Sequence, residues 1–326
     1  MKKIFFQKCS LNYIFFLLYF VANFISLNLR MDFPEENIAE EENIYNSSAL
    51  MINIYLMTLS NFLGIIPFCL LKRSSKGKIY EADNKLNEKE INSALIYNNI
   101  DINANASKTK KNLIYGFLVA FFEFIANFTI LLFYIIFPKL SPLFYSVNCT
   151  VVYSVIIQFI LSYFLLKMHF YKLQKFTLII NIIIFFVLLI FDLINIIIYE
   201  AFNGEIYGFY FLMLTFFAIE YTYVKKAFLE GFLSPYKSLI LRGIYMVILS
   251  LIFSVISFFI DKRIFINMPY FFLNVKYILR SVGFFIFNFF KDLFSWIIID
   301  RFSPNYLPLC FILDDISFYV SNFEKH

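Results

Sequence analysis

The stretch from Ser141 to Glu200 decides the fold, and it reads SPLFYSVNCTVVYSVIIQFILSYFLLK, then MHFYKLQK, then FTLIINIIIFFVLLIFDLINIIIYE. Each of the two apolar runs is long enough to cross the hydrocarbon core of a bilayer, which takes about 20 residues. The short connection between them carries basic side chains. This pattern predicts a transmembrane helical hairpin, and similar apolar runs recur from one end of the chain to the other.

Composition extends the prediction to the whole chain. Hydrophobic residues make up 61% of the 326 residues and charged residues only 16%, whereas soluble proteins carry about 25% charged residues. A soluble core of this size could not bury so much apolar surface, so we expect the lipid bilayer as a partner. The net charge of +5 does not indicate nucleic-acid binding, because the cations lie between the apolar runs, where the positive-inside rule explains them.

Several classes of function are excluded by residues that the chain lacks. The chain has only two histidines, so an enzyme built on a histidine cluster is not expected, and no GxxxxGK[ST] loop occurs that could hold ATP. The cysteines show neither metal-ligand spacing nor a disulfide framework: Cys9, Cys69, Cys149 and Cys310. We therefore expect no cofactor, no metal site and no enzymatic activity.

The order of apolar and polar segments predicts an all-α, polytopic bundle of nine or ten transmembrane spans. Residues 1–71 hold the first two spans and an acidic lumenal loop, residues 72–111 form a basic, Asn-rich loop that we expect to be disordered, and residues 112–326 hold the remaining spans. A segment before the eighth span is ambiguous. The nine predicted spans are 11–28, 49–71, 112–137, 142–167, 176–199, 206–226, 235–261, 281–299 and 306–323.

The distribution of Lys and Arg predicts the orientation of these spans. The basic N-terminus resembles a signal peptide, but no small-residue cleavage site follows it, so we expect an uncleaved first helix. Counted over alternate connections, nineteen Lys and Arg lie on one side and seven on the other. The positive-inside rule then places the N-terminus and the 72–111 loop in the cytosol, and nine spans place the C-terminus on the opposite side.

Several local strings have an order that is shared with a known protein family. Glu123 lies in the third predicted span, Ser141 in the turn that follows, and Lys167 at the end of the fourth span. Further on come Gly204, Ala218-Ile219-Glu220, Val224-Lys225, Pro235 and Arg242-Gly243. In span order and spacing, residues 49–259 resemble the drug/metabolite transporter superfamily and, within it, solute carrier family 35, subfamily F.

The chain departs from that family at diagnostic positions. Tyr145 to Cys149 stand where the family has QMLRG, Glu220 stands for a Gln, and Arg242 stands for a Glu. The resemblance implies ten spans in two inverted repeats of five. Nine are predicted here, so either a longer gene product or a partner would supply the tenth.

The resemblance also implies a function. It implies a secondary transporter that moves a small organic metabolite, anionic ones included, by alternating access across an endomembrane (Golgi, ER, or vacuole or lysosome) rather than the plasma membrane. A homo-oligomer is compatible with this function. The alternative is a non-transporting membrane scaffold, a degenerate member that keeps the fold. A membrane enzyme ranks third, because the paired acids Asp314 and Asp315 have neither a nucleophile nor a metal constellation beside them.

Ionisable residues inside the predicted spans are the candidate substrate pathway, because a charge at the bilayer centre is costly and is usually paired or hydrated. Glu220 and Arg242 lie at about the same depth, roughly 9 Å from the same connection at a rise of about 1.5 Å per residue. We predict a salt bridge between them; the alternative is that Arg242 extends to the membrane surface.

Two of the remaining pathway candidates, Lys291 and Glu123, each have two interpretations. Lys291 could hold a substrate phosphate, as the resemblance implies, or could be neutralised by Asp314. Glu123, with Asn127 one helical turn away, could bind a proton or the substrate, or could hydrogen-bond a neighbouring helix. Asn148 completes the predicted pathway.

Two further motifs carry weaker predictions. Asn46-Ser47-Ser48 is a glycosylation sequon in the predicted lumenal loop. Gly204 and Gly208 form a GxxxG pair that could allow close helix contact. Asp192, near the end of the fifth span, is expected to contact headgroups or water.

Overall fold

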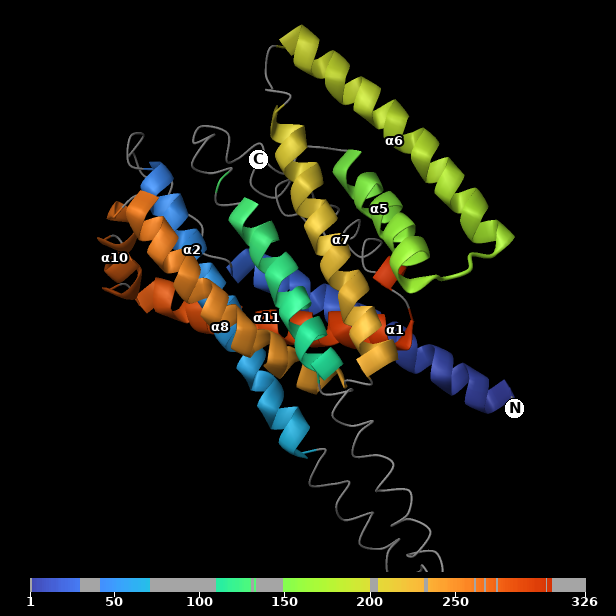
Figure 1. Ribbon diagram of the computed structural model, residues 1–326, viewed down its shortest axis with the longest axis horizontal. Helices are drawn as coiled ribbons and strands as arrows, with labels where there is room; N and C mark the ends of the chain where they lie inside the picture. Colours follow the sequence, from blue (N-terminus) through green and yellow to red (C-terminus); the bar gives the residue numbers. More distant parts are fainter. Residues whose placement is uncertain are drawn as a thin grey trace, which may run out of the picture.

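The structure is a computed structural model, and every described element in it is a helix, with no β-strand among the described residues (Figure 1). It describes residues 2–29, 42–70, 110–129, 132, 149–199, 205–231, 234–260, 262–266, 268–273, 275–302 and 304–306. The all-α prediction is confirmed for these residues. Nearly all of the predicted ninth span (306–323) and of the 72–111 loop lies outside them.

The helices follow the predicted order of spans, with shifted ends. Their bounds are α1 Lys2–Leu29, α2 Glu42–Ser60, η1 Asn61–Gly64, a helix at Lys110–Thr129, α5 Cys149–Leu166, α6 Lys172–Tyr199, α7 Glu205–Gly231, α8 Pro235–Ile260, α9 Arg263–Ile266, α10 Met268–Leu273, α11 Val275–Arg301 and η3 Pro304–Tyr306. The ambiguous segment before the eighth span forms α9, α10 and the first turns of α11. The eighth helix therefore begins before Ser281, where the sequence predicted its start.

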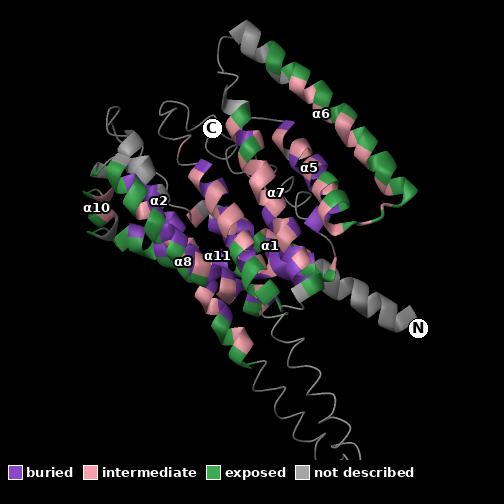
Figure 2. Cartoon of the chain, viewed as in Figure 1, coloured by how far each residue is buried: buried purple, intermediate pink, exposed green. Residues whose placement is uncertain are grey.

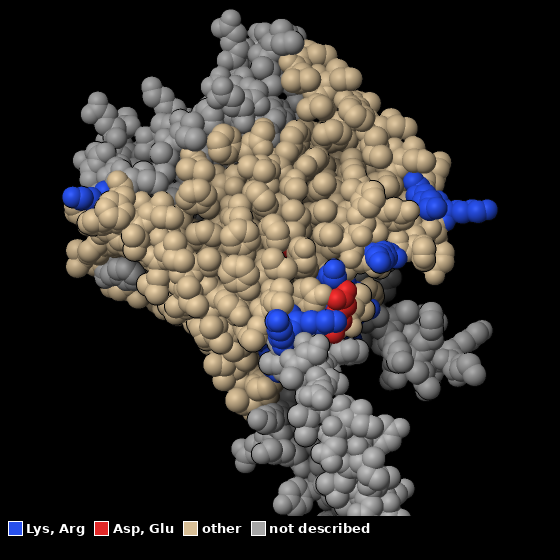
Figure 3. Space-filling model, viewed as in Figure 1, with Lys and Arg blue, Asp and Glu red and all other residues tan. Residues whose placement is uncertain are grey.

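Among the described residues, five helical segments are long and apolar enough to cross a membrane: Met51–Leu70, Lys110–Thr129, Lys172–Phe191, Pro235–Phe259 and Val275–Arg301. Shorter apolar stretches lie in α1 and α5, at Ile14–Ser26 and Val152–Leu166. This is the build of an integral membrane protein. Figure 3 agrees, because the broad middle of the visible face is almost entirely tan and the basic side chains lie towards its edges.

The hairpin predicted from residues 141–200 is present as α5 and α6, which pack against each other. The backbone leaves the helix at Lys167, which has a positive φ of 53°, an uncommon conformation for a residue with a side chain. Residues 141–148 lie outside the described part of the chain. α6 then runs apart from the main bundle (Figure 1).

α6 offers apolar side chains on all sides. None of the apolar stretch Lys172–Phe191 is buried, and Figure 2 shows exposed and intermediate residues along the described length of this helix. In water, such a surface would be an aggregation hazard. In a bilayer it is the expected state, because lipid tails cover it.

The start of α8 is set by local sequence. Pro235 is the first helical residue, where its fixed φ fits and its missing N–H is not needed. The Ser234 hydroxyl accepts a hydrogen bond from the Lys237 backbone N–H at 3.3 Å, which is the geometry of an N-cap. The predicted start of this span at Ser234-Pro235 is thus confirmed.

α2 and α8 pack along a row of small and hydroxyl-bearing side chains. The hydroxyls of Thr58 and Ser250 lie 3.3 Å apart, and one turn away Tyr55 and Ser254 share a hydrogen bond. Lipid offers no hydrophobic driving force between helices, so packing and hydrogen bonds of this kind hold membrane helices together. This row fixes α2 against α8.

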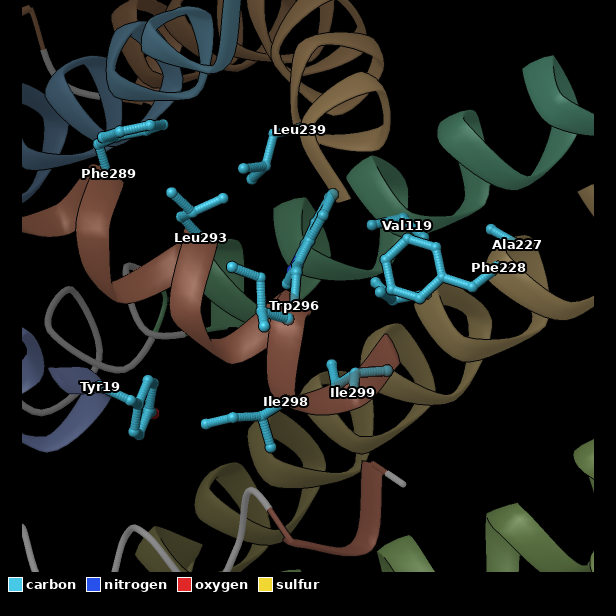
Figure 4. Close-up of a cluster of buried hydrophobic side chains, with 12 residues drawn as sticks. Tyr19, Val119, Ala227, Phe228, Leu239, Phe289, Leu293, Trp296, Ile298 and Ile299 are labelled. Carbon is cyan, nitrogen blue, oxygen red and sulfur yellow. The ribbon is translucent and has the colours of Figure 1, made fainter. Parts of the chain in front are cut away.

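The principal apolar core is formed by α1, α7, α8, α11 and the Lys110–Thr129 helix. Trp296 lies at its middle, with Leu239 on one side and Val119 and Phe228 on another (Figure 4). Trp296 is 1% exposed, although a tryptophan is seldom buried so fully. The core therefore gathers helices that are far apart in the sequence around one side chain of α11.

One of the two weaker motif predictions is wrong. The sequon Asn46-Ser47-Ser48 lies within α2 rather than in a loop, because the helix begins seven residues before the predicted span start at Ala49, and Ser48 is buried. For the GxxxG pair, a Cβ atom at Gly208 would meet no described atom within 4 Å. Gly204 lies outside the described residues, so close contact through the pair stays a prediction.

Candidate functional site

Arg242 of α8 is the centre of a buried ionic cluster. Its Nε and Nη2 atoms donate hydrogen bonds to the two carboxylate oxygens of Glu123, on the Lys110–Thr129 helix. The same Nη2 atom lies 3.2 Å from Oδ2 of Asp292, on α11. Three helices are therefore joined by one guanidinium group, whose planar fork suits two-point recognition of a carboxylate.

An aromatic ring adds a further contact to this cation. The Arg242 guanidinium carbon lies 5.2 Å from the centre of the Trp296 ring, within the range of a cation–π interaction. Trp296 follows Asp292 by four residues, so both lie on the same face of α11. One helix face thus supplies a carboxylate and an aromatic ring to the same arginine.

The predicted salt bridge between Glu220 and Arg242 is wrong. Arg242 is 3% exposed and uses its fork on Glu123, so the alternative in which it extends to the membrane surface is wrong as well. Counting helical rise gives the position of a residue along its helix but not the direction of its side chain around the helix axis, and Arg242 points to Glu123. Glu220, on α7, is 2% exposed and makes no ion pair with another described residue.

The other predicted pathway residues divide into three groups. Lys291 is a member of the cluster, because its Nζ lies 3.5 Å from Oδ1 of Asp292. Asn127 is buried, but its Nδ2 donates to the Glu123 backbone carbonyl at 3.0 Å and so contacts its own helix. Asn148 and Asp314 lie outside the described residues, so the proposed Lys291–Asp314 neutralisation stays a prediction.

The sequence reasoning missed two buried asparagines beside the cluster. Asn288 donates from Nδ2 to Ser60 Oγ at 3.0 Å and lies 3.4 Å from Asp292 Oδ2. Its Oδ1 atom, and both amide atoms of Asn61, find no hydrogen-bond partner among the described residues. Buried polar atoms are nearly always paired, so these three atoms make this position unusual among the described residues. The i, i+4 spacing of Asn288 and Asp292 was the signal that could have revealed Asn288.

Asn61 lies where the helix that begins as α2 changes its winding. Residues Asn61–Gly64 form the 3₁₀ turn η1 within the apolar segment Met51–Leu70, and such a turn inside a helix often marks a functional position. A Cβ atom added to Gly243 would lie 3.1 Å from Asn61 Cβ. Because Gly243 is next to Arg242 in the chain, η1 crosses α8 at the level of the ionic cluster.

Lys225 forms a second buried charge site at the end of α11. Its Nζ donates to the backbone carbonyls of Ile299 and Asp300, each at 2.8 Å. A helix end leaves carbonyls without partners and carries partial negative charge, so a lysine there is favourable. Lys225 was counted as a loop cation from the sequence; it instead joins α7 to α11.

The cluster has the features of a binding site for a polar or charged solute. Among the described residues, it combines three acids, two cations and unpaired amide groups inside an apolar bundle: Glu123, Glu220, Asp292, Arg242, Lys291, Asn61 and Asn288. No protein-family model, curated protein or solved structure matches this chain. Its function is therefore inferred from the chemistry of this cluster.

Proposed function

We propose that this protein is a secondary transporter of a small organic metabolite, anionic ones included, and that the ionic cluster is its substrate site. The observation that carries the proposal is a set of unpaired amide atoms at the cluster. They are Oδ1 of Asn288, whose Nδ2 contacts Asp292, and both amide atoms of Asn61, on the turn η1 that crosses α8 next to Arg242. Together with the buried charges of Arg242 and Asp292, they offer hydrogen-bond donors, acceptors and charges to one polar molecule.

The membrane setting supports this proposal. Charged side chains inside membrane helices are rare and mark substrate or ion pathways more often than not. Transporters also bind substrates where membrane helices are interrupted, near the middle of the bilayer. The turn η1 interrupts the regular winding of the segment Met51–Leu70 and carries Asn61.

The order of the helices supplies further support. It resembles the drug/metabolite transporter superfamily, in which two inverted repeats of five spans alternate around a central site, and we propose the same arrangement here. We further propose an endomembrane location, with the N-terminus and the 72–111 loop in the cytosol. The excess of Lys and Arg on that side is the basis for the orientation.

A membrane scaffold is the second candidate function, and one observation favours it. The two-point pair between Arg242 and Glu123, with the Trp296 ring beside it, would also hold a rigid bundle together without any movement. A carrier must exchange such contacts between its two states, whereas a scaffold keeps them.

Uptake of metabolites by liposomes that contain the purified protein distinguishes a carrier from a scaffold. Purified full-length protein in liposomes is exposed to a cell metabolite extract, and the vesicle contents are measured by mass spectrometry against protein-free vesicles. We expect at least one small polar solute to accumulate only where the protein is present. If no solute accumulates while the protein remains folded and monodisperse, the carrier proposal is overturned in favour of the scaffold.

A further inference from the structure

The charges of the described cluster do not balance when every group is ionised. Arg242 contacts the carboxylates of Glu123 and Asp292, and Lys291 contacts Asp292. Two cations are thus shared by two carboxylates. Glu220 is a third acid, 2% exposed, on α7, which packs against both α8 and α11. It has no ion pair to any described residue, so its ionisation would add one uncompensated negative charge.

The surroundings of Glu220 come from several helices. α7 packs against α8, which carries Arg242, and against α11, which carries Lys291 and Asp292. On the Lys110–Thr129 helix, the residue before Glu123 is Phe122, whose ring stacks on that of Tyr223 of α7 at 5.6 Å between centroids. α5, the other long helix packed against α7, contains no Asp, Glu, Lys, Arg or His. On its own helix, Glu220 is followed directly by Tyr221 and five residues later by Lys225. Lys225 donates hydrogen bonds to carbonyls at the end of α11.

Burial makes the charged form of Glu220 unfavourable. A charge taken out of water needs a close partner of opposite sign, and each cation of the cluster already has a carboxylate nearer to it. When the Glu220 carboxylate binds one proton, a new O–H bond forms and the described cluster becomes neutral. No other described group in the cluster needs to change its charge.

We propose that Glu220 is a proton-binding site and that its proton couples solute movement to the H⁺ gradient. The carboxylate takes the proton from water on one side of the membrane, and the same O–H bond breaks to return the proton to water on the other side. Coupling rests on the transporter proposed above, whereas proton binding by Glu220 does not.

The position of the unpaired amide groups supports coupling between the proton and the solute. Asn288 contacts Asp292, and Asp292 contacts Arg242, so a solute bound by these groups would lie within the electrostatic reach of Glu220. A negatively charged solute would favour the protonated acid, and a cation would favour its release. Proton and solute therefore influence each other through one shared cluster, as coupling requires.

Infrared spectroscopy of the purified full-length protein tests proton binding without any substrate. At neutral pH, the wild type should show the C=O stretch of a protonated carboxyl group, and Glu220→Gln should lose it. Glu230→Gln is the matched control, because Glu230 lies on the same helix but its side chain is 44% exposed. A band of equal size in wild type and Glu220→Gln overturns the inference.

Internal pH tests the coupling, with liposomes that contain a pH-sensitive dye and receive the same metabolite extract. We expect a pH change in wild type and Glu230→Gln, and one about tenfold smaller in Glu220→Gln, a ratio typical of coupled sites. Solute uptake without any pH change, or with a response to Na⁺ instead, overturns proton coupling and leaves the carrier standing. Absence of all uptake overturns the carrier, and the infrared result still decides whether Glu220 binds a proton.

Discussion

Arg242 and Glu123 are 119 residues apart in the chain, yet two guanidinium nitrogens of the arginine bind both carboxylate oxygens of the glutamate inside the bundle. This pair joins α8 to the Lys110–Thr129 helix, and Asp292 extends it to α11. The packing of three helices therefore depends on the buried charge of Arg242.

A double-mutant cycle should measure this dependence. Breaking a buried ion pair by removing one partner costs about 3–5 kcal/mol, because the other charge is left alone. We expect Arg242→Gln and Glu123→Gln each to lower the unfolding free energy by about this amount, and the double variant to lose less than the sum of the two. Chemical unfolding in detergent micelles is the measurement.

A second double-mutant cycle, with Glu220 and Arg242, gives the coupling energy with which the first is compared. These two residues share no ion pair in the structure, so their coupling energy should be smaller than that of Glu123 and Arg242. An equal or larger value would show that Arg242 pairs with Glu220, as the sequence alone predicted.

Gly243 and Gly208 should respond differently to the same substitution. A Cβ at Gly243 would lie 3.1 Å from Asn61 Cβ, whereas at Gly208 it would meet no described atom within 4 Å. We expect Gly243→Ala to destabilise by about 1–3 kcal/mol through overpacking. Gly208→Ala should be neutral or stabilising, because alanine is the better helix former. Equal melting temperatures of the two variants would contradict the close crossing of η1 and α8.

Lys225 and its neighbour Lys226 provide a second matched pair. Lys225 is buried and donates to two carbonyls at the end of α11, whereas Lys226 forms a partly exposed pair with Glu230 at 3.8 Å. We expect Lys225→Met to cost about 1–3 kcal/mol, as for charged hydrogen bonds, and Lys226→Met less than about 1 kcal/mol. Thermal unfolding in detergent distinguishes them, and a larger loss for Lys226→Met would refute the assignment.

The fold was largely predictable because apolar length is a local property. The hairpin of α5 and α6 and the start of α8 at Pro235 follow directly from runs of apolar residues and from proline and serine chemistry. The segment at 263–280 was ambiguous because Lys276 and Arg280 interrupt its apolar pattern. In the structure they lie in the first turns of α11.

Most charged members of the candidate site were predictable, but their pairing was not. An ionisable residue inside an apolar run can be seen in the sequence, and of the residues marked in this way Glu123, Glu220 and Arg242 are buried and Lys291 is partly buried. The direction of each side chain depends on how helices rotate and cross, and no single sequence gives that. Asn61 was missed because asparagine is abundant in this chain and its position in a 3₁₀ turn is visible only in three dimensions.

Reporters attached to the C-terminus and to the 72–111 loop should test the span count. Nine spans place these two sites on opposite sides of the membrane, since an odd number of crossings reverses the side of the chain end. A protease-protection or glycosylation reporter can read each side. If both reporters lie on the same side, the prediction of nine spans is wrong.

Solute uptake by matched arginine variants tests the central claim most directly. Liposomes with wild type, Arg242→Gln or Arg280→Gln receive the same metabolite extract, and Arg280 is the control because it lies on α11 outside the cluster. We expect Arg280→Gln to retain uptake, and a folded Arg242→Gln to lose it by about tenfold or more, equivalent to about 1.4 kcal/mol. Uptake by folded Arg242→Gln at the wild-type rate would show that the ionic cluster is not the transport site.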